Sequence, residues 1–337
     1  MINKKSVFKK IGLTSIVMST CFTLYSPTSL ADTKINDIVE IGQNEQKAKV
    51  YNNFSTIFDE QKKMKTSLLV SIIADPYSNK QIAVIKTDGS NINANKYVQG
   101  LADNYGHNAG YMSALLKWAS SYNIEMELSN ANSQFYKVSP INTVDKKTIT
   151  SSVGYNIGGE IKVSDKVDGG GSGGMNWSTS TSYDQPDYKT VLETDTANKV
   201  QWKVPFISSM NQGYGPYTRD SDDSIYRNQL FMKSRNASYW AKDNFISSDE
   251  MPALAAYGFS PGMIAVVVAD KSEKISNLKV TYTRTSDDYR MDWNSFFNGV
   301  HGSGSGWWVG GNIKNVNIDK STHNYVLDWK NHKLIEN

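Results

Sequence analysis

The stretch SSVGYNIGGEIKVSDKVDGGGSGGMNWSTSTSY, residues 151–183, decides the fold class of this chain. On each side of its glycine-rich run Asp168–Gly174, apolar and polar residues alternate. Successive side chains of a β-strand point to opposite faces, so the alternation predicts a β-hairpin with one apolar and one polar face. The apolar face is expected to hold Val153, Tyr155, Ile157, Ile161, Val163, Met175, Trp177 and Tyr183. The polar face is expected to hold Asn156, Glu160, Lys162 and Asn176.

The two arms of this hairpin, Ser151–Val163 and Met175–Tyr183, are 13 and 9 residues long. A strand that crosses a membrane needs about 9–11 residues, so both arms have nearly the required length. On pattern alone, an amphipathic surface hairpin of a β-sandwich is the favoured explanation. Gly154, Gly158 and Gly159 argue against it, because glycine in a strand loses entropy on folding and packs nothing in return. A segment that leaves one setting for another would tolerate them.

The first 31 residues have the features of an export signal. Four lysines precede the apolar run Ile11–Leu24, and small residues up to Ala31 offer a cleavage site. A secreted protein is therefore expected. Without those four lysines the formal net charge falls from +3 to −1, and the single cysteine, Cys21, is also removed. A nearly neutral chain gives no electrostatic reason to expect nucleic acid as a partner.

The remaining chain predicts an all-β protein. Many short strand-like runs are separated by turn-forming residues, which is typical of a β-sandwich. The longest apolar run, Met263–Ala269, has the length of a buried strand. Gly110–Tyr122 also fits a helix, and this alternative stays open. Other strands are expected at Ser67–Ile73, Gln81–Lys86, Tyr122–Leu128 and Val191–Phe206.

Aromatic residues gather in loop-like segments of the second half. Trp and Tyr favour membrane interfaces because one end is apolar and the other polar. For any single residue, a place in the core explains the sequence equally simply. As a cluster, however, they predict a membrane contact by Trp240, Trp293, Phe296, Phe297, Trp307 and Trp308.

Motifs of enzymes are not convincing in this chain. A G-x-G-x-x-G and a G-x-S-x-G pattern both fall inside the low-complexity run Asp168–Gly174, where the structural context that each motif requires is missing. The four histidines include no pair at metal-ligand spacing, and Asp287-Asp288 is interpreted as a polar turn. The prediction is a protein without catalytic activity, cofactor or metal.

The hairpin and the following Gln185–Thr190 resemble the stem of the α-hemolysin/leukocidin family of β-barrel pore-forming toxins. Further blocks occur in the order of that family. Lys80–Ile85 and the C-terminus are most similar to single-component members such as cytotoxin K. The other blocks are Tyr214–Tyr217 with Arg219–Ser221, Asn228–Arg235, Gly258–Pro261, Asp287–Tyr289 and Asp328–Lys330.

The resemblance implies a β-sandwich cap, a membrane-facing rim and a stem hairpin that joins an oligomeric transmembrane barrel. After the signal peptide (1–31), it divides the chain into an N-terminal arm or latch (32–54), the first part of the cap with some rim (55–144), the stem (145–187), a cap strand (188–206), a rim-rich region (207–260) and the second part of the cap (261–337) with a rim loop (290–312). The apolar hairpin face would then contact lipid and the polar face would line the channel.

The resemblance also implies a rim site for the phosphocholine head group at Tyr214, Gln229 and Arg235. An aromatic face attracts the quaternary ammonium, and arginine pairs with the phosphate. Family members often have Trp where Tyr214 stands and glycine where Arg227 stands. A charged pair that many relatives carry at the mouth of the stem is replaced by Thr148 and Ser182.

Strand geometry sets the expected assembly. A barrel of about 16 strands holds a channel, whereas about 8 strands are filled by side chains. At two strands per chain, a homo-oligomer of about seven or eight subunits is expected. The sequence therefore predicts a secreted cytolysin that binds host-cell membranes through phosphocholine lipids, with an unknown protein or glycan receptor as a further partner. The alternatives are one subunit of a bicomponent leukocidin, or a secreted β-sandwich lectin or adhesin.

Overall fold

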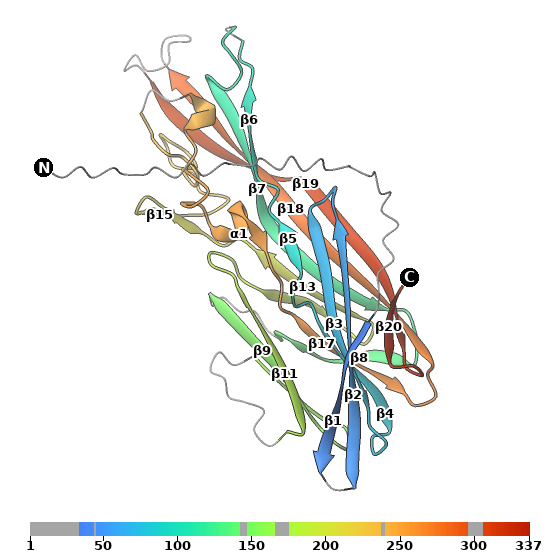
Figure 1. Cartoon of the computed structure of the whole chain (residues 1–337). Coiled ribbons are helices and arrows are strands. Elements are labelled where there is room, and N and C mark those ends of the chain that lie inside the picture. Colours follow the sequence, from blue (N-terminus) through green and yellow to red (C-terminus); the bar gives the residue numbers. More distant parts are fainter. Residues whose placement is uncertain are drawn as a thin grey trace, which may run out of the picture. The chain divides into compact units, whose positions relative to one another are not determined.

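The computed structural model describes residues 34–43, 45–104, 106–141, 147–165, 175–236, 240–295 and 306–337. The fold is all-β, as predicted, and is built around two antiparallel sheets that enclose the main core (Figure 1). A smaller sheet, which contains the expected stem, packs on the other face of the first sheet. Among the described residues, no helix is both long and apolar enough to cross a membrane.

The first sheet contains the N-terminal strands and two strands from the second half of the chain. Its order is β1 (Lys34–Gln43), β2 (Gln46–Asp59), β3 (Met64–Ala74), β4 (Lys80–Lys86), β17 (Ile264–Asp270) and β8 (Ser133–Ser139). Two short strands join it at the side, β5 (Asn91–Asn93) on β3 and β16 (Gly258–Phe259) on β5.

The second sheet is built on two long C-terminal strands. Its order is β12 (Val191–Asp195), β13 (Lys199–Pro205), β7 (Ser113–Leu128), β18 (Ile275–Ser295), β19 (Gly306–Asp328) and β20 (Lys333–Glu336), with β6 (Tyr97–Leu101) beside β7. In the described residues between β13 and β17 the elements are short: β14 (Ser209–Asn211), β15 (Tyr214–Tyr217), the 3₁₀ turn η1 (Ala241–Asp243), the helical turn α1 (Ala253–Ala256) and β16.

The run Met263–Ala269 is apolar throughout because β17 is covered on both of its faces. Ala265 and Val267 face the main core between the two sheets. Ile264 and Val266 face the opposite side, where they pack with apolar residues of the stem. A strand covered on both faces needs no alternation of apolar and polar residues. The prediction of a buried strand is confirmed.

The expected N-terminal arm contains two strands that its sequence did not reveal. β1 pairs with β2 from Lys34 opposite Phe54 to Gln43 opposite Gln46. The inward positions of β2 include Asn53, which is fully buried. Its side-chain amide donates to the carbonyl of His332 at 3.1 Å and accepts from the N–H of Leu334 at 3.2 Å. Because a polar residue occupies a core position, the apolar periodicity of a strand is interrupted.

The helix considered for Gly110–Tyr122 is not formed. β7 begins at Ser113 and pairs with β18 along most of its length. Leu116 is buried while Leu115 is only half-buried, which fits a strand with two different faces. Pairing with β13 and β18 on both edges outweighs the local helical spacing. The strand expected at Val191–Phe206 is two strands, β12 and β13, joined by a turn.

Candidate functional site

The expected stem forms a three-stranded sheet with β9 (Thr148–Asn156) in the centre, β10 (Glu160–Ser164) on one side and β11 (Trp177–Asp184) on the other. The first arm is therefore not one strand, which corrects the prediction from the sequence. A turn at Gly158 and Gly159, with φ of +98° and +101°, folds β10 back onto β9. Glycine accepts these positive φ angles without the steric cost of a Cβ. The run Asp168–Gly174 lies outside the described residues.

The two faces of the stem lie in different surroundings. Val153 and Tyr155 are fully buried, and Ile161 is 6% exposed, in one cluster with residues of β2, β4 and β17. Ile157, Val163 and Trp177 are partly buried against the same cluster, Met175 is half-buried, and Tyr183 belongs to the main core. On the other face Glu160, Lys162 and Asn176 are exposed and Asn156 is half-buried. The cap thus covers the apolar face of the stem.

A buried carboxylate attaches the tip of the stem to the cap. Asp75, between β3 and β4, is 1% exposed. Its Oδ2 accepts from the hydroxyl of Tyr155 at 2.5 Å and from the N–H of Gly158 at 2.7 Å, and its Oδ1 accepts from the N–H of Tyr77 at 2.7 Å. Burial and the bond to Asp75 raise the pKa of Tyr155, which keeps its hydroxyl as a donor. Hydrogen bonds to a carboxylate are stronger than neutral ones, so Asp75 is the main polar contact of the stem tip.

The two neutral residues at the mouth of the stem, Thr148 and Ser182, lie beside a carboxylate. The hydroxyl of Thr148 donates to the carboxylate of Asp184 at 2.6 Å, and Ser182 is exposed. These residues belong to neighbouring positions of β9 and β11, where Thr148 lies opposite Asp184.

The segment 207–260, which the sequence predicts to be rich in rim elements, brings together the three residues expected to bind a lipid head group. Tyr214, Gln229 and Arg235 line one cavity of about 260 Å³, together with Lys233. The Nε of Arg235 donates to Oε1 of Gln229 at 2.7 Å. The Cζ of Arg235 lies 5.0 Å from the ring centroid of Tyr214. Among the described residues no carboxylate lines this cavity, so its charge is positive.

Two further residues hold Arg235 in place and were not found from the sequence. The ring of Tyr226 lies 4.8 Å from the Cζ of Arg235. The carboxylate of Asp223 accepts from the side-chain amide of Gln229, and its Oδ1 also accepts from the N–H of Tyr226 at 2.6 Å. Burial opposes ionisation of Asp223, but these and other backbone donors leave its pKa lowered. No sequence pattern marks Tyr226 or Asp223, because the conformation of a loop, and not a strand periodicity, brings them close to Arg235.

The aromatic residues expected to contact a membrane lie in different places. Trp308 is fully buried and Trp293 is 9% exposed, and their rings pack at 4.9 Å in the main core. The prediction of a membrane contact is wrong for these two side chains in this structure. Their positions face each other across β18 and β19, where both side chains turn inward.

The other described residues of that aromatic group, Trp307 and Trp240, are only partly buried. Trp307 is half-buried and its indole N–H donates to the carbonyl of Ile225 at 2.9 Å. Trp240 is half-buried beside Tyr111, at 5.4 Å between ring centroids. Phe296 and Phe297 lie outside the described residues.

The pair Asp287-Asp288 is not a turn but part of β18. Asp287 is fully buried, and its carboxylate accepts from Nε and Nη2 of Arg219, both at 2.7 Å. Burial opposes ionisation of Asp287, yet the bonds from Arg219, Asn315 and Asn312 leave its pKa lowered. The ion pair between Arg219 and Asp287 links the segment after β15 to the second sheet. Within the described ranges, no group of three His, Cys, Asp or Glu side chains is arranged to hold a metal ion.

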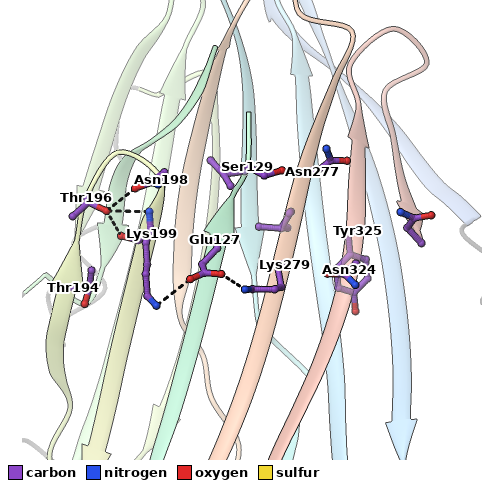
Figure 2. A pocket seen from close by; sticks show the side chains of 13 residues that line it. Glu127, Ser129, Thr194, Thr196, Asn198, Lys199, Asn277, Lys279, Asn324 and Tyr325 are labelled. Atoms are coloured by element: carbon purple, nitrogen blue, oxygen red, sulfur yellow. Dashed lines mark hydrogen bonds and ion pairs between the residues drawn. The ribbon is translucent and has the colours of Figure 1, made fainter. Parts of the chain in front are cut away.

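A cavity of about 680 Å³ lies at one end of the second sheet (Figure 2). Glu127 on β7 accepts from Lys199 of β13 at 3.0 Å and from Lys279 of β18, and Lys199 also pairs with Glu125 at 2.9 Å. Bonds from Lys279 and Lys199 lower the pKa of Glu127, and the two glutamates raise the pKa of Lys199. These ion pairs connect three adjacent strands, β13, β7 and β18, so the charged residues of this cavity have a structural role in the sheet.

A β-sandwich whose amphipathic hairpin is folded against its own cap defines the class of β-barrel pore-forming toxins. The model of the Leukocidin/Hemolysin toxin family matches residues 66–331. Gamma-hemolysin component B of Staphylococcus aureus is 31% identical over 328 residues, which are 96% of this chain and 95% of the relative. The chain belongs to the Leukocidin/Hemolysin toxin family.

Solved structures agree with this assignment. Clostridium perfringens delta-toxin has a TM-score of 0.78 at 22% identity, over 90% of this chain and 98% of that structure, which supports the fold alone. The Clostridium perfringens NetB toxin in its membrane-inserted form has a TM-score of 0.64 at 26% identity, over 86% of this chain and 100% of that structure. The chain is a secreted pore-forming toxin that inserts into target-cell membranes.

Proposed function

We propose that this toxin acts alone, as a single-component cytolysin that assembles into a homo-oligomer on host-cell membranes. The docked stem is the observation that carries pore formation, and the resemblance of Lys80–Ile85 and the C-terminus to single-component members supports action without a second protein. Its apolar side chains Val153, Tyr155 and Ile161 are covered by the cap, and its polar face is exposed. A soluble monomer needs this arrangement, because an uncovered apolar stem would aggregate in water.

Insertion requires the docked sheet to rearrange. The turn at Gly158 and Gly159 must open so that β10 continues the arm that begins with β9, and β9 already pairs with β11. Val153 and Ile161 are eight positions apart. In one continuous strand an even separation places two side chains on the same face, so both stay on the apolar face after the turn opens. A single hairpin has two open edges, which hydrocarbon does not tolerate, so hairpins of several subunits must close a barrel. About seven or eight subunits would enclose a channel.

The rim cavity is proposed to bind the phosphocholine head group of target lipids. Arg235 and Lys233 offer donors to a phosphate, and the exposed ring of Tyr214 offers a face to the quaternary ammonium. The free energy of the whole process comes from burying the apolar stem face in lipid and closing the strand ladder. No catalytic step is required.

Leakage from phosphatidylcholine vesicles tests whether the pure protein acts alone. We expect release of an entrapped dye, together with a ring-shaped, detergent-resistant oligomer. One subunit of a bicomponent toxin is the second candidate, because a relative is named as component B of gamma-hemolysin. That candidate predicts binding without leakage until a partner protein is added. A lectin or adhesin predicts binding without leakage and without an oligomer.

Single cysteines test which stem face contacts lipid. Ile157→Cys and Asn156→Cys place an environment-sensitive dye on opposite faces of the first arm. After vesicle insertion, we expect the emission of the dye at position 157 to shift to the blue, and the dye at position 156 to report water. Opposite parity, or no difference between the two positions, would contradict the assignment of the stem.

A further inference from the structure

The base of the docked stem contacts the cap through polar groups that lack partners. Ser151 on β9 lies directly opposite Thr181 on β11, on the same face of the strand as Val153, which packs on the cap. Ser151 is fully buried and Thr181 is 6% exposed. Within the described part of the chain, neither hydroxyl oxygen has a hydrogen-bond partner. A buried hydroxyl without a partner is less stable there than in water.

The cap leaves these hydroxyls little freedom to find a partner. Gly262, just before β17, is buried against β11. A Cβ added at Gly262 would lie 2.8 Å from Oγ1 of Thr181 and 3.1 Å from the carbonyl oxygen of Ser182. The backbone of the cap thus packs closely on the stem at this level.

A buried lysine contacts the same part of β11. Lys86 at the end of β4 is 6% exposed, and its ammonium donates to the carbonyl of Ser180 at 3.2 Å. Burial lowers the pKa of Lys86, and Asp88 opposes this shift. An ammonium group has three donors, and in the described residues Lys86 uses one of them. Here too the stem covers a group that water would solvate better.

The tip of the stem is bound differently. Val153, Tyr155 and Ile161 pack on apolar residues of the cap, and Asp75 fixes the turn at Gly158. In the docked stem, the buried polar groups at the tip therefore have hydrogen-bond partners, whereas several of those at the base do not.

We infer that Lys86, Ser151 and Thr181 form a release contact, a set of under-bonded buried groups that weakens the docking of the stem. When the stem first leaves the cap, before it enters lipid, all three groups are exposed to water, so their desolvation in the docked state favours release. The inference rests on the proposed function, since it concerns the same stem. It assigns to these residues a role opposite to that of Asp75.

Variants that remove the unpaired hydroxyls test the release contact. We expect Thr181→Val and Ser151→Ala each to slow dye release from phosphatidylcholine vesicles about tenfold at equal bound protein, which corresponds to about 1.4 kcal/mol. The melting temperature of the soluble monomer should rise in both. Lys86→Met should act in the same direction. Because valine would also favour a lipid-facing site, slower release points to the docked state.

Three controls separate this role from general effects on the stem. Thr181→Ser keeps the hydroxyl and should leak at the rate of the wild type. Ser152→Ala and Ser182→Ala lie next in sequence but on the other face, and should change the rate less than twofold. Wild-type rates in both Thr181→Val and Ser151→Ala, with unchanged melting temperatures, would overturn the inference. Faster leakage by Lys86→Met would remove Lys86 from the contact.

The measurements distinguish failure of this inference from failure of the proposed function. If the wild type does not leak without a partner protein, the single-component proposal is wrong. The melting temperatures of the soluble variants still decide whether the hydroxyls weaken docking.

Discussion

Asp75→Ala should loosen the tip of the stem before the protein meets a membrane. The substitution removes the acceptor of the Tyr155 hydroxyl and of the Gly158 N–H, both at the stem tip. Tyr155 is fully buried, so its hydroxyl would be left without this partner inside the protein. Losing charge-assisted bonds to buried donors should lower the free energy of unfolding by about 2–4 kcal/mol.

Limited proteolysis in the absence of lipid measures this effect. Lys162, on the exposed face of β10, should become a site of rapid cleavage in Asp75→Ala but not in the wild type. Tyr155→Phe should show an intermediate effect, since it removes one of the bonds and keeps the ring. Asp184→Ala is the matched control, because Asp184 is an exposed carboxylate at the base of the stem. Equal cleavage of Asp75→Ala and Asp184→Ala would show that Asp75 does not hold the stem.

Arg235→Ala should weaken binding to phosphatidylcholine vesicles about 10- to 100-fold. A charge-assisted bond contributes about 1.5–3 kcal/mol, and each 1.4 kcal/mol is a factor of ten in affinity. Arg235 lines the rim cavity, and Gln229 and Tyr226 hold its guanidinium in place. Co-sedimentation with vesicles below the concentration needed for pores would measure the affinity.

A second rim arginine provides the control for charge. Arg290 is exposed, pairs with Asp292 at 2.7 Å and does not line the cavity of Arg235. Arg290→Ala should therefore bind vesicles nearly as well as the wild type. If both variants lose affinity equally, binding depends on net charge and not on a head-group site at Arg235.

The sequence predicted which residues form the stem, but not how the stem packs on the rest of the protein. Alternation between Val153 and Tyr183 is a local property of the chain, and it assigned each side chain to a face. It did not reveal that β10 folds back onto β9, because the turn at Gly158 and Gly159 depends on Asp75, about 80 positions earlier. The same holds for the release contact, since Ser151 and Thr181 read as ordinary strand residues.

Local pattern by itself determined that the chain is all-β, that one hairpin has an apolar and a polar face, and that the strand after Met263 is buried. The tertiary structure decided what fills each position. Trp308 is inside the core because β18 and β19 turn it inward, and Asn53 occupies a core position because the backbone near His332 satisfies its amide. Periodicity reports which side of a strand a residue occupies, whereas burial depends on the partner that covers that side, and distant parts of the chain supply the partner.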